Sequence, residues 1–136
     1  MKAFGALMLC AMMLALVLAT AVAGAATKTG TKGDDVLRGT PQADEFHGQA
    51  GDDKLYGGAG GDTIVGGWGS DRIVGGEGRD RIAAGEGHDR VFGNQGRDRI
   101  RARDATHDIV DCGKGVDRVL VDPRDELRSC ELRVRP

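Results

Sequence analysis

The sequence contains none of the residue patterns by which most enzymes are recognised. It has no paired carboxylates outside its repeat, no Ser-His-Asp arrangement and no phosphate-binding loop. Its three histidines, His47, His88 and His107, are not spaced as zinc ligands are. Once the repeat described below is assigned, no remaining stretch is long enough to fold as a catalytic domain. We therefore expect a protein that is not an enzyme.

The chain also lacks a strong excess of charge of either sign. It has 19 basic and 21 acidic residues, a net charge of −2, and loss of Lys2 with the leader described next would make it −3. Proteins that bind nucleic acid usually carry a basic surface or a basic domain. The charge balance therefore excludes nucleic acid as an expected partner.

Charged residues are missing from the first part of the chain after Lys2. Residues 3–26 are uncharged and mostly apolar, and Ala21, Val22 and Ala23 fit the small-x-small rule for cleavage. We interpret residues 1–23 as a secretory signal peptide and predict a secreted, extracellular protein with no membrane attachment once the leader is removed. Because residues 3–26 are also long enough to span a bilayer, an uncleaved membrane anchor is the alternative.

Cysteine is scarce as well, with Cys112 and Cys130 the two that lie beyond the leader. An even pair in an exported protein is more often a disulfide than a nucleophile. The alternative is a thiol triad of Cys112 with His107 and Asp108, although nothing else in the sequence resembles a cysteine hydrolase. We predict the disulfide.

What the sequence has in abundance is glycine, 23 residues in all, and aspartate, arranged in a nine-residue repeat. Ten copies of the phrase G-G-x-G-x-D-x-U-x, where U is a bulky apolar residue, occupy residues 30–101 and 103–120, with one extra residue at Ala102. A disordered glycine-rich linker would not keep the aspartate and apolar columns in register over ten copies. A period this strict indicates a solenoid.

Each copy divides into six Gly- and Asp-rich residues that can turn tightly and three residues, such as 63–65, that favour a strand. Successive side chains of a strand face opposite sides, so all eighth positions share one side. Two copies would make one 18-residue turn of a flattened right-handed coil, with two parallel sheets facing each other across the eighth positions. We predict an all-β solenoid of about five such turns.

Such a coil has a core only one residue thick per strand, so something else must hold its loops. Sixth-position aspartates 18 residues apart would stack about 4.8 Å from one another on one edge of the coil. Rows of carboxylates that close repel unless a cation lies between them. Carboxylates together with the carbonyls of glycine turns form an oxygen-only ligand set, which suits calcium better than magnesium.

These copies closely resemble the hemolysin-type calcium-binding nonapeptide, the RTX repeat, over residues 30–120. The resemblance implies a parallel β-roll with calcium held between loops of the same edge by the sixth-position aspartates and by loop carbonyls. Counting neighbouring intact loops gives about five calcium ions. The implied metal ligands are Asp35, Asp53, Asp62, Asp71, Asp80, Asp89, Asp98 and Asp117, with the loop glycines Gly51, Gly60, Gly69, Gly78, Gly87 and Gly96.

Two copies depart from the pattern. The second has Thr40, Pro41, Gln42 and Ala43 in place of its glycines, and the ninth has residues 104–107 in theirs. These departures leave ligation by the aspartates of the two copies, Asp44 and Asp108, open.

The expected organisation is a signal peptide (1–23), a short N-terminal tail (24–29), the repeat coil (30–120) and a C-terminal cap (121–136). Cys112 and Cys130 are 18 residues apart, one full turn, so their disulfide would hold the cap over the last repeat. We expect a secreted protein that folds on binding several calcium ions. The alternative is a calcium-stabilised adhesion module at the cell surface, in which a ladder of Arg81, Arg99 and Arg118 binds an acidic polysaccharide or another cell-surface component.

Overall fold

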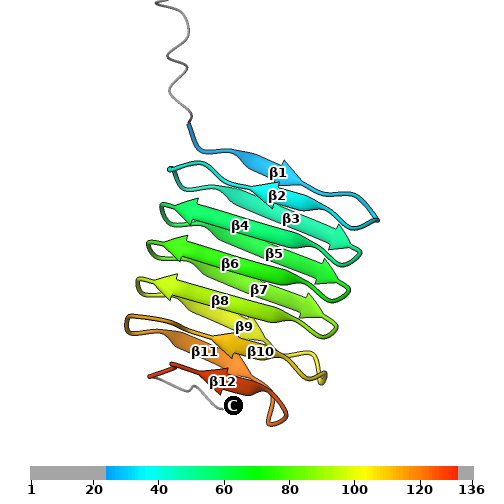
Figure 1. The fold of residues 1–136 in the computed structure, drawn as a ribbon, viewed down its shortest axis with the longest axis vertical. Helices are drawn as coiled ribbons and strands as arrows, with labels where there is room; N and C mark the ends of the chain where they lie inside the picture. Colours follow the sequence, from blue (N-terminus) through cyan, green and yellow to red (C-terminus); the bar gives the residue numbers. More distant parts are fainter. Residues whose placement is uncertain (1–23, 132–136) are drawn as a thin grey trace, which may run out of the picture.

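The computed structural model describes residues 24–131, which form a flattened coil of parallel strands (Figure 1). The predicted signal peptide, residues 1–23, lies outside the described residues, as do residues 132–136 of the expected cap. Within residues 24–131 no helix is long and apolar enough to cross a membrane. The all-β fold predicted from the repeat is confirmed.

Twelve strands make two six-stranded sheets, and the chain changes sheet after every strand. One sheet has the order β1-β3-β5-β7-β9-β11 and the other the order β12-β10-β8-β6-β4-β2. The coil therefore completes about six turns, close to the expected five. The first sheet contains β1 (Thr27–Thr29), β3 (Glu45–Ala50), β5 (Thr63–Trp68), β7 (Arg81–Glu86), β9 (Arg99–Ala102) and β11 (Arg118–Val121). The second contains β2 (Val36–Arg38), β4 (Lys54–Ala59), β6 (Arg72–Glu77), β8 (Arg90–Gln95), β10 (Ile109–Asp111) and β12 (Glu126–Arg128).

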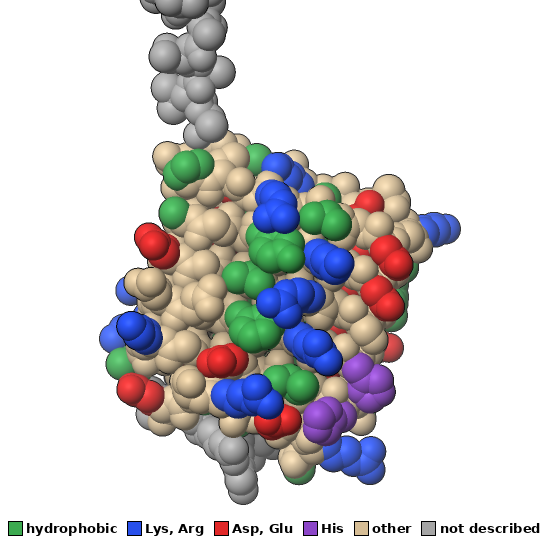
Figure 2. All heavy atoms as spheres, viewed as in Figure 1, with side chains coloured by type: hydrophobic (Ala, Val, Ile, Leu, Met, Phe, Trp, Pro, Cys, Tyr) green, Lys and Arg blue, Asp and Glu red, His purple; other side chains and the backbone are tan. Residues whose placement is uncertain are grey.

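The seventh and ninth positions of the copies lie on the side of each strand opposite to the eighth and point outward. On the second sheet, whose outer face is seen in Figure 2, basic and apolar side chains lie interleaved along the coil. The register places Tyr56 beside Val74 and Val74 beside Phe92. The guanidinium of Arg72 lies 4.7 Å from the centre of the Phe92 ring, a cation–π contact. This contact offsets part of the repulsion between Arg72 and Arg90, which are neighbours in register.

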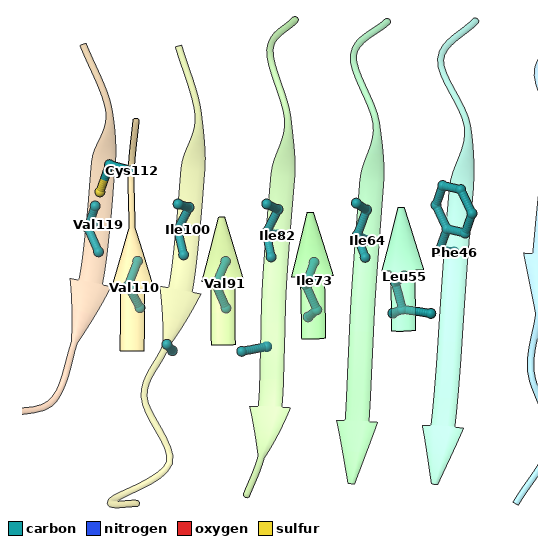
Figure 3. Close-up of a cluster of buried hydrophobic side chains, with 12 residues drawn as sticks. Phe46, Leu55, Ile64, Ile73, Ile82, Val91, Ile100, Val110, Cys112 and Val119 are labelled. Carbon is teal, nitrogen blue, oxygen red and sulfur yellow. The ribbon is translucent and has the colours of Figure 1, made fainter. Parts of the chain in front are cut away.

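The eighth positions form the core between the two sheets, as predicted (Figure 3). Ile64, Ile82 and Ile100 are partners in register across β5, β7 and β9. Each column thus stacks one apolar side chain per turn. The buried eighth-position residues are Phe46, Leu55, Ile64, Ile73, Ile82, Val91, Ile100, Val110 and Val119.

Most strands are longer than the three residues expected. From β3 to β8 each has six, because the ladder continues through the first three positions of the next copy. The first position then faces inward like the eighth, and there is little room for it. A Cβ on Gly57 would lie 2.3 Å from the carbonyl oxygen of Gly75 and 2.3 Å from Oδ2 of Asp62. Glycine at this position lets neighbouring turns approach while the strand continues.

Alanine in place of Gly78 should destabilise the coil by about 2–5 kcal/mol, because Gly78 has a positive φ of 129° and leaves no space for a Cβ. That Cβ would lie 2.0 Å from the carbonyl oxygen of Gly60. Thermal unfolding in excess calcium measures the effect. Gly33→Ala is the matched control, since its Cβ would meet nothing closer than Thr31 Oγ1 at 3.9 Å. Equal melting temperatures for the two variants would contradict this account of the turn.

The coil extends beyond the ten copies at both ends. Residues 27–29 of the expected tail form β1, in which Lys28 pairs with Phe46. At the other end β12 pairs with β10, so that Val110 is beside Leu127. The spacing of Asp125 and Leu127 repeats that of the sixth and eighth positions. This additional copy was not recognised from the sequence because it has no glycines before Asp125.

We expected the extra residue of the ninth copy at Ala102, and this expectation is wrong. Ala102 is fully buried and pairs with Val121 in the sheet, so it occupies the first position of its copy, as Ala84 does one turn earlier. The insertion therefore falls in the loop of residues 103–107. A loop takes an extra residue at little cost, whereas a shift in the strand would turn its core residues outward.

The predicted disulfide between Cys112 and Cys130 is present, with 5.0 Å between the two Cα atoms. It ties the end of β10 to the segment that follows β12. Because its sulfur is bonded to Cys130, Cys112 is not the free thiol that a triad with His107 and Asp108 would need.

Candidate metal centre

The structure places the sixth-position aspartates in two columns, one along each edge of the coil. Those that precede the strands of the second sheet are Asp35, Asp53, Asp71, Asp89 and Asp108, and those that precede the strands of the first sheet are Asp44, Asp62, Asp80, Asp98 and Asp117. All except Asp35 are buried, with at most 4% of each residue exposed. The columns predicted from the 18-residue spacing are thus present, and they lie inside the loops.

One oxygen of each buried carboxylate is used by the coil itself. The backbone N–H of Asp62 donates to Oδ1 of Asp80 at 2.8 Å, and the N–H of Asp80 donates to Oδ1 of Asp98 at 2.9 Å. The carbonyl of Asp62 in turn accepts the N–H of Arg81 at 2.8 Å. Each aspartate therefore links its own turn to both neighbouring turns.

In eight of the nine buried carboxylates, all except that of Asp44, the second oxygen has no partner among residues 24–131. A buried polar atom without a hydrogen bond is costly, and a buried unpaired charge is more so. These oxygens therefore require a proton or a cation. The unpartnered atoms are Oδ2 of Asp53, Asp62, Asp71, Asp80, Asp89, Asp98, Asp108 and Asp117.

Burial changes the acidity of the aspartates in the middle of the columns. It raises the pKa of Asp80 and of Asp89 to about 7, and that of Asp71, Asp98 and Asp108 to about 6. Hydrogen bonds from backbone N–H groups oppose this rise, and the neighbouring carboxylates of each column add to it. The pKa values of Asp53 and Asp62 are also raised, first of all by burial. Negative charge in the columns is thus held poorly by the protein alone.

The loop glycines that were expected as calcium ligands with the aspartates also stack on one another in successive turns. Gly51, Gly60, Gly69, Gly78, Gly87 and Gly96 all have positive φ. A Cβ on Gly69 would lie 2.1 Å from the carbonyl oxygen of Gly51, so one carbonyl of each loop faces the next loop of the same edge. Backbone oxygens are therefore present between successive turns.

Carboxylates alone do not complete a site. Across residues 24–131 no three His, Cys, Asp or Glu side chains converge as metal ligands. A cation here would need backbone carbonyls for much of its coordination, as the sequence resemblance implies. The unpartnered Oδ2 atoms and the all-oxygen donor set fit a hard ion such as calcium.

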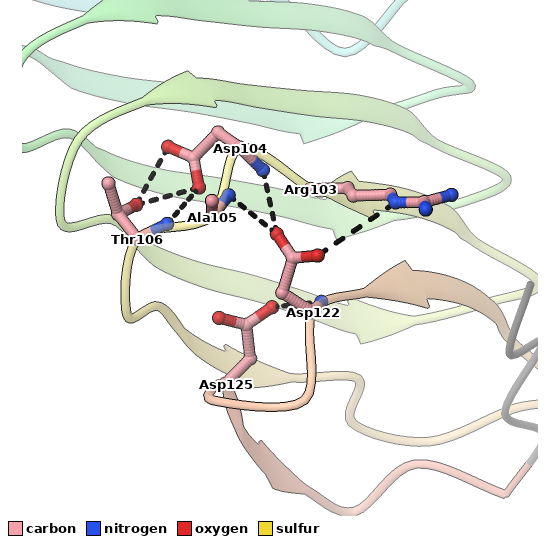
Figure 4. Close-up of polar contacts among 6 residues, drawn as sticks. All are labelled: Arg103, Asp104, Ala105, Thr106, Asp122 and Asp125. Carbon is pink, nitrogen blue, oxygen red and sulfur yellow. Dashed lines mark hydrogen bonds and ion pairs between the residues drawn. The ribbon is translucent and has the colours of Figure 1, made fainter.

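The irregular ninth loop is closed differently, by hydrogen bonds within the protein (Figure 4). The carboxylate of Asp104 accepts the N–H of Gly87 at 2.8 Å and both the N–H and the hydroxyl of Thr106. Although burial raises the pKa of Asp104, these bonds outweigh it and leave that pKa below its ordinary value. Asp122 accepts the N–H groups of Asp104 and Ala105.

The last loop continues the aspartate column. Oδ1 of Asp125 accepts the N–H of Asp108 at 3.0 Å, and its Oδ2 accepts the N–H of Asp122 at 2.6 Å. Asp125 thus takes the place of a sixth-position aspartate. Sequence analysis assigned no role to Asp122 or Asp125; only the spacing of Asp125 from Leu127 signalled it.

Comparison with known proteins bears on this arrangement. The family model of the RTX calcium-binding nonapeptide repeat, which comprises four copies, matches residues 29–64 and residues 65–100. No curated protein matches the chain. Among solved structures, the chain is similar to a subunit of the Azotobacter vinelandii mannuronan C5-epimerase, at 30% sequence identity and a TM-score of 0.28. The alignment covers 64% of this chain and 51% of that one, so it spans about half the length of the solved subunit.

Proposed function

The chain belongs to the family of RTX calcium-binding nonapeptide repeats, and we propose that it is a secreted protein that folds when several calcium ions bind between its stacked loops. The observation that carries this proposal is the row of buried Oδ2 atoms without partners on each edge of the coil. Calcium bound beside them would neutralise the columns and join neighbouring turns.

The residues proposed to hold calcium are the aspartates whose Oδ2 has no partner, together with carbonyls of the loops next to them. Asp71 and Asp89 lie in adjacent turns of one edge, and Asp80 and Asp98 in adjacent turns of the other. Flexible sites rich in carbonyl oxygen and low in charge bind weakly, and extracellular calcium modules work at about 10⁻⁴–10⁻³ M. Inside the cell, where calcium is scarce, the chain would then stay unfolded and suited to export.

The proposed role is binding without catalysis. In the described residues Cys112, the sulfur that the sequence offered as a nucleophile, is held in a disulfide. The buried aspartates donate or accept hydrogen bonds along the columns and are not arranged as an acid with a separate base. Incubation with a broad panel of hydrolase and lyase substrates should give no turnover. A turnover activity that wild type has and the Asp80→Asn variant lacks would contradict this part of the proposal.

The variant Asp80→Asn tests the proposal, because its effect should change sign with calcium. Asparagine keeps an oxygen to accept the N–H of Asp62 but carries no charge. Without calcium at pH 8 the variant should be more stable than wild type by about 1–3 kcal/mol, and in excess calcium it should be less stable by a similar amount. Thermal unfolding measures the difference in calcium, and the sucrose concentration needed to fold each chain measures the difference without it.

A surface charge change gives the control. Glu77 is the last residue of β6, three residues before Asp80, and is exposed, so Glu77→Gln removes a charge without touching the column. It should leave stability nearly unchanged in both conditions. If Asp80→Asn destabilises the protein equally with and without calcium, the aspartate is a structural acceptor and the proposal fails.

A second candidate function is a calcium-stabilised module that binds an acidic polysaccharide at the cell surface. It is favoured by the alignment of Arg81, Arg99 and Arg118 in register on the first sheet and by a shallow hollow of about 330 Å³ beside Arg101 and Leu120. Binding to an array of acidic glycans that is lost in Arg81→Ala with Arg99→Ala, while calcium uptake stays the same, would establish it. Equal glycan binding by the variant and wild type would exclude this ladder.

A further inference from the structure

The first turn of the coil differs from the others in how its aspartates are paired. The row of unpartnered Oδ2 atoms begins at Asp53 and Asp62, and the two earlier aspartates are not part of it. In Asp35, Oδ2 accepts the N–H of Thr31 at 2.6 Å and its hydroxyl at 2.9 Å. The first turn thus supplies the Oδ2 of its aspartate with donors that the sixth-position aspartates from Asp53 to Asp117 lack.

The same arrangement recurs in the second copy. Oδ2 of Asp44 accepts the N–H of Thr40 at 2.5 Å and its hydroxyl at 3.0 Å. The hydroxyl oxygen of Thr40 also accepts the N–H of Gln42 at 3.1 Å, which closes the loop from within. Asp44 is 4% exposed and Thr40 is half-buried, so the pairing is partly buried.

The backbone at the second position explains the difference. This position has a positive φ in the third to eighth copies, for example 82° at Gln49, 113° at Gly76 and 71° at Asn94. Thr31 and Thr40 are not among the residues with positive φ, which a β-branched side chain strongly disfavours. The two threonines therefore hold the loop in a conformation in which the second-position N–H reaches the carboxylate.

We infer that Thr31 and Thr40 take the place of calcium in the first turn, so that the calcium columns begin at Asp53 and Asp62 and the N-terminal end of the coil is closed without metal. This inference rests on the proposed function, because it specifies which loops bind the ion. It removes Asp35 from the set of ligands expected from the sequence.

Two exchanges at the second position test the inference through the number of calcium ions bound per chain. Thr31→Gly combined with Thr40→Gly introduces the glycine found at this position in most later copies, for example Gly58 and Gly76. Titration calorimetry and elemental analysis of the purified protein should show more calcium per chain than wild type, by one ion for each gap restored. The matched control is Thr31→Ser with Thr40→Ser, which keeps both hydroxyls and should bind as wild type does.

The reverse exchange introduces a threonine at the second position of a copy that is proposed to bind calcium. Gln49 occupies the second position of the third copy, and Gln49→Thr should give Asp53 the donors that Asp35 has and reduce the calcium count by one ion. Gln49→Asn is the control, since asparagine tolerates positive φ and should leave the count unchanged. Because Gln49 is exposed and already carries a side chain, this pair stays informative even if the double glycine variant fails to fold.

The outcomes separate this inference from the proposal on which it rests. If wild type binds no calcium at millimolar concentration, the proposed function fails. If wild type binds calcium and both exchanges leave the count unchanged, only the role of the threonines is overturned. A higher count in the glycine variant or a lower count in Gln49→Thr, with the controls unchanged, supports it.

Discussion

Removal of calcium from the purified protein at pH 7.5 should unfold the coil. Eight buried carboxylate oxygens then have no partner, and the carboxylates of each column repel one another across about one strand spacing. A ligand present at 100 times its Kd stabilises the folded state by about 2.7 kcal/mol per site, so several sites together exceed the stability of a typical small domain. Far-ultraviolet circular dichroism should lose its β signal in chelator and regain it with calcium.

Magnesium is the control for this result. It demands near-ideal octahedral geometry and gives up its water reluctantly, so it should restore little of the signal at the same concentration. A protein whose circular dichroism and melting temperature are the same in chelator and in calcium would contradict the proposed role of the columns.

In protein stripped of metal, acidification from pH 8 to pH 5 should restore order to the coil. The pKa values of Asp80 and Asp89 in the folded state are about 7, well above the 3.8 of an ordinary aspartate. Between those two values the folded state binds more protons than the unfolded state, so stability is present at low pH and is lost as the pH rises through 6 to 7. We expect a melting transition at pH 5 whose temperature falls by more than about 10 °C as the pH rises, and no transition at pH 8.

Excess calcium should reverse this dependence, because protons and calcium compete for the same oxygens. Melting curves in metal-free buffer and in calcium, each across the pH range, measure both signs. The variant Asp80→Asn with Asp89→Asn should show a weaker dependence in the metal-free series. A melting temperature independent of pH without metal would show that the buried carboxylates do not control folding.

The fold was predictable because the repeat imposes it twice, through the aspartate column and through the apolar column. Ile64, Ile82 and Ile100 are 18 residues apart in sequence and adjacent in register. With two copies per turn, that spacing fixes both the pairing of strands and the side chains that meet in the core. The disulfide followed from the same spacing.

The strand lengths and the last copy were not predictable in the same way. Local propensity places glycine in turns. Gly57 and Gly58 nevertheless lie inside β4, because a side chain there would clash with the neighbouring turns. The copy that ends in β12 has no glycine before Asp125, so only its aspartate and Leu127 mark it. In both cases packing between turns decides the structure, and that information is absent from any single copy.

The site was predictable as a column of aspartates but not in its differences from turn to turn. Asp35 and Asp62 both follow the consensus, yet Thr31 pairs the first and nothing in the described residues pairs Oδ2 of the second. That distinction depends on the backbone conformation at the second position. A threonine there is the sequence signal, and its meaning becomes evident only from the hydrogen bonds.

Every strand pair in the coil joins segments separated by a single turn of the chain, as Thr63 with Arg81 and Arg81 with Arg99 illustrate. Among residues 24–131 no strand pairing joins the two ends of the coil, so each added turn meets the same surface as the one before it. Duplication or loss of an 18-residue segment such as 57–74 would leave the partners of all remaining strands equivalent. Insertion or deletion of whole 18-residue turns during evolution can therefore change the length of this protein without a change in how its core packs.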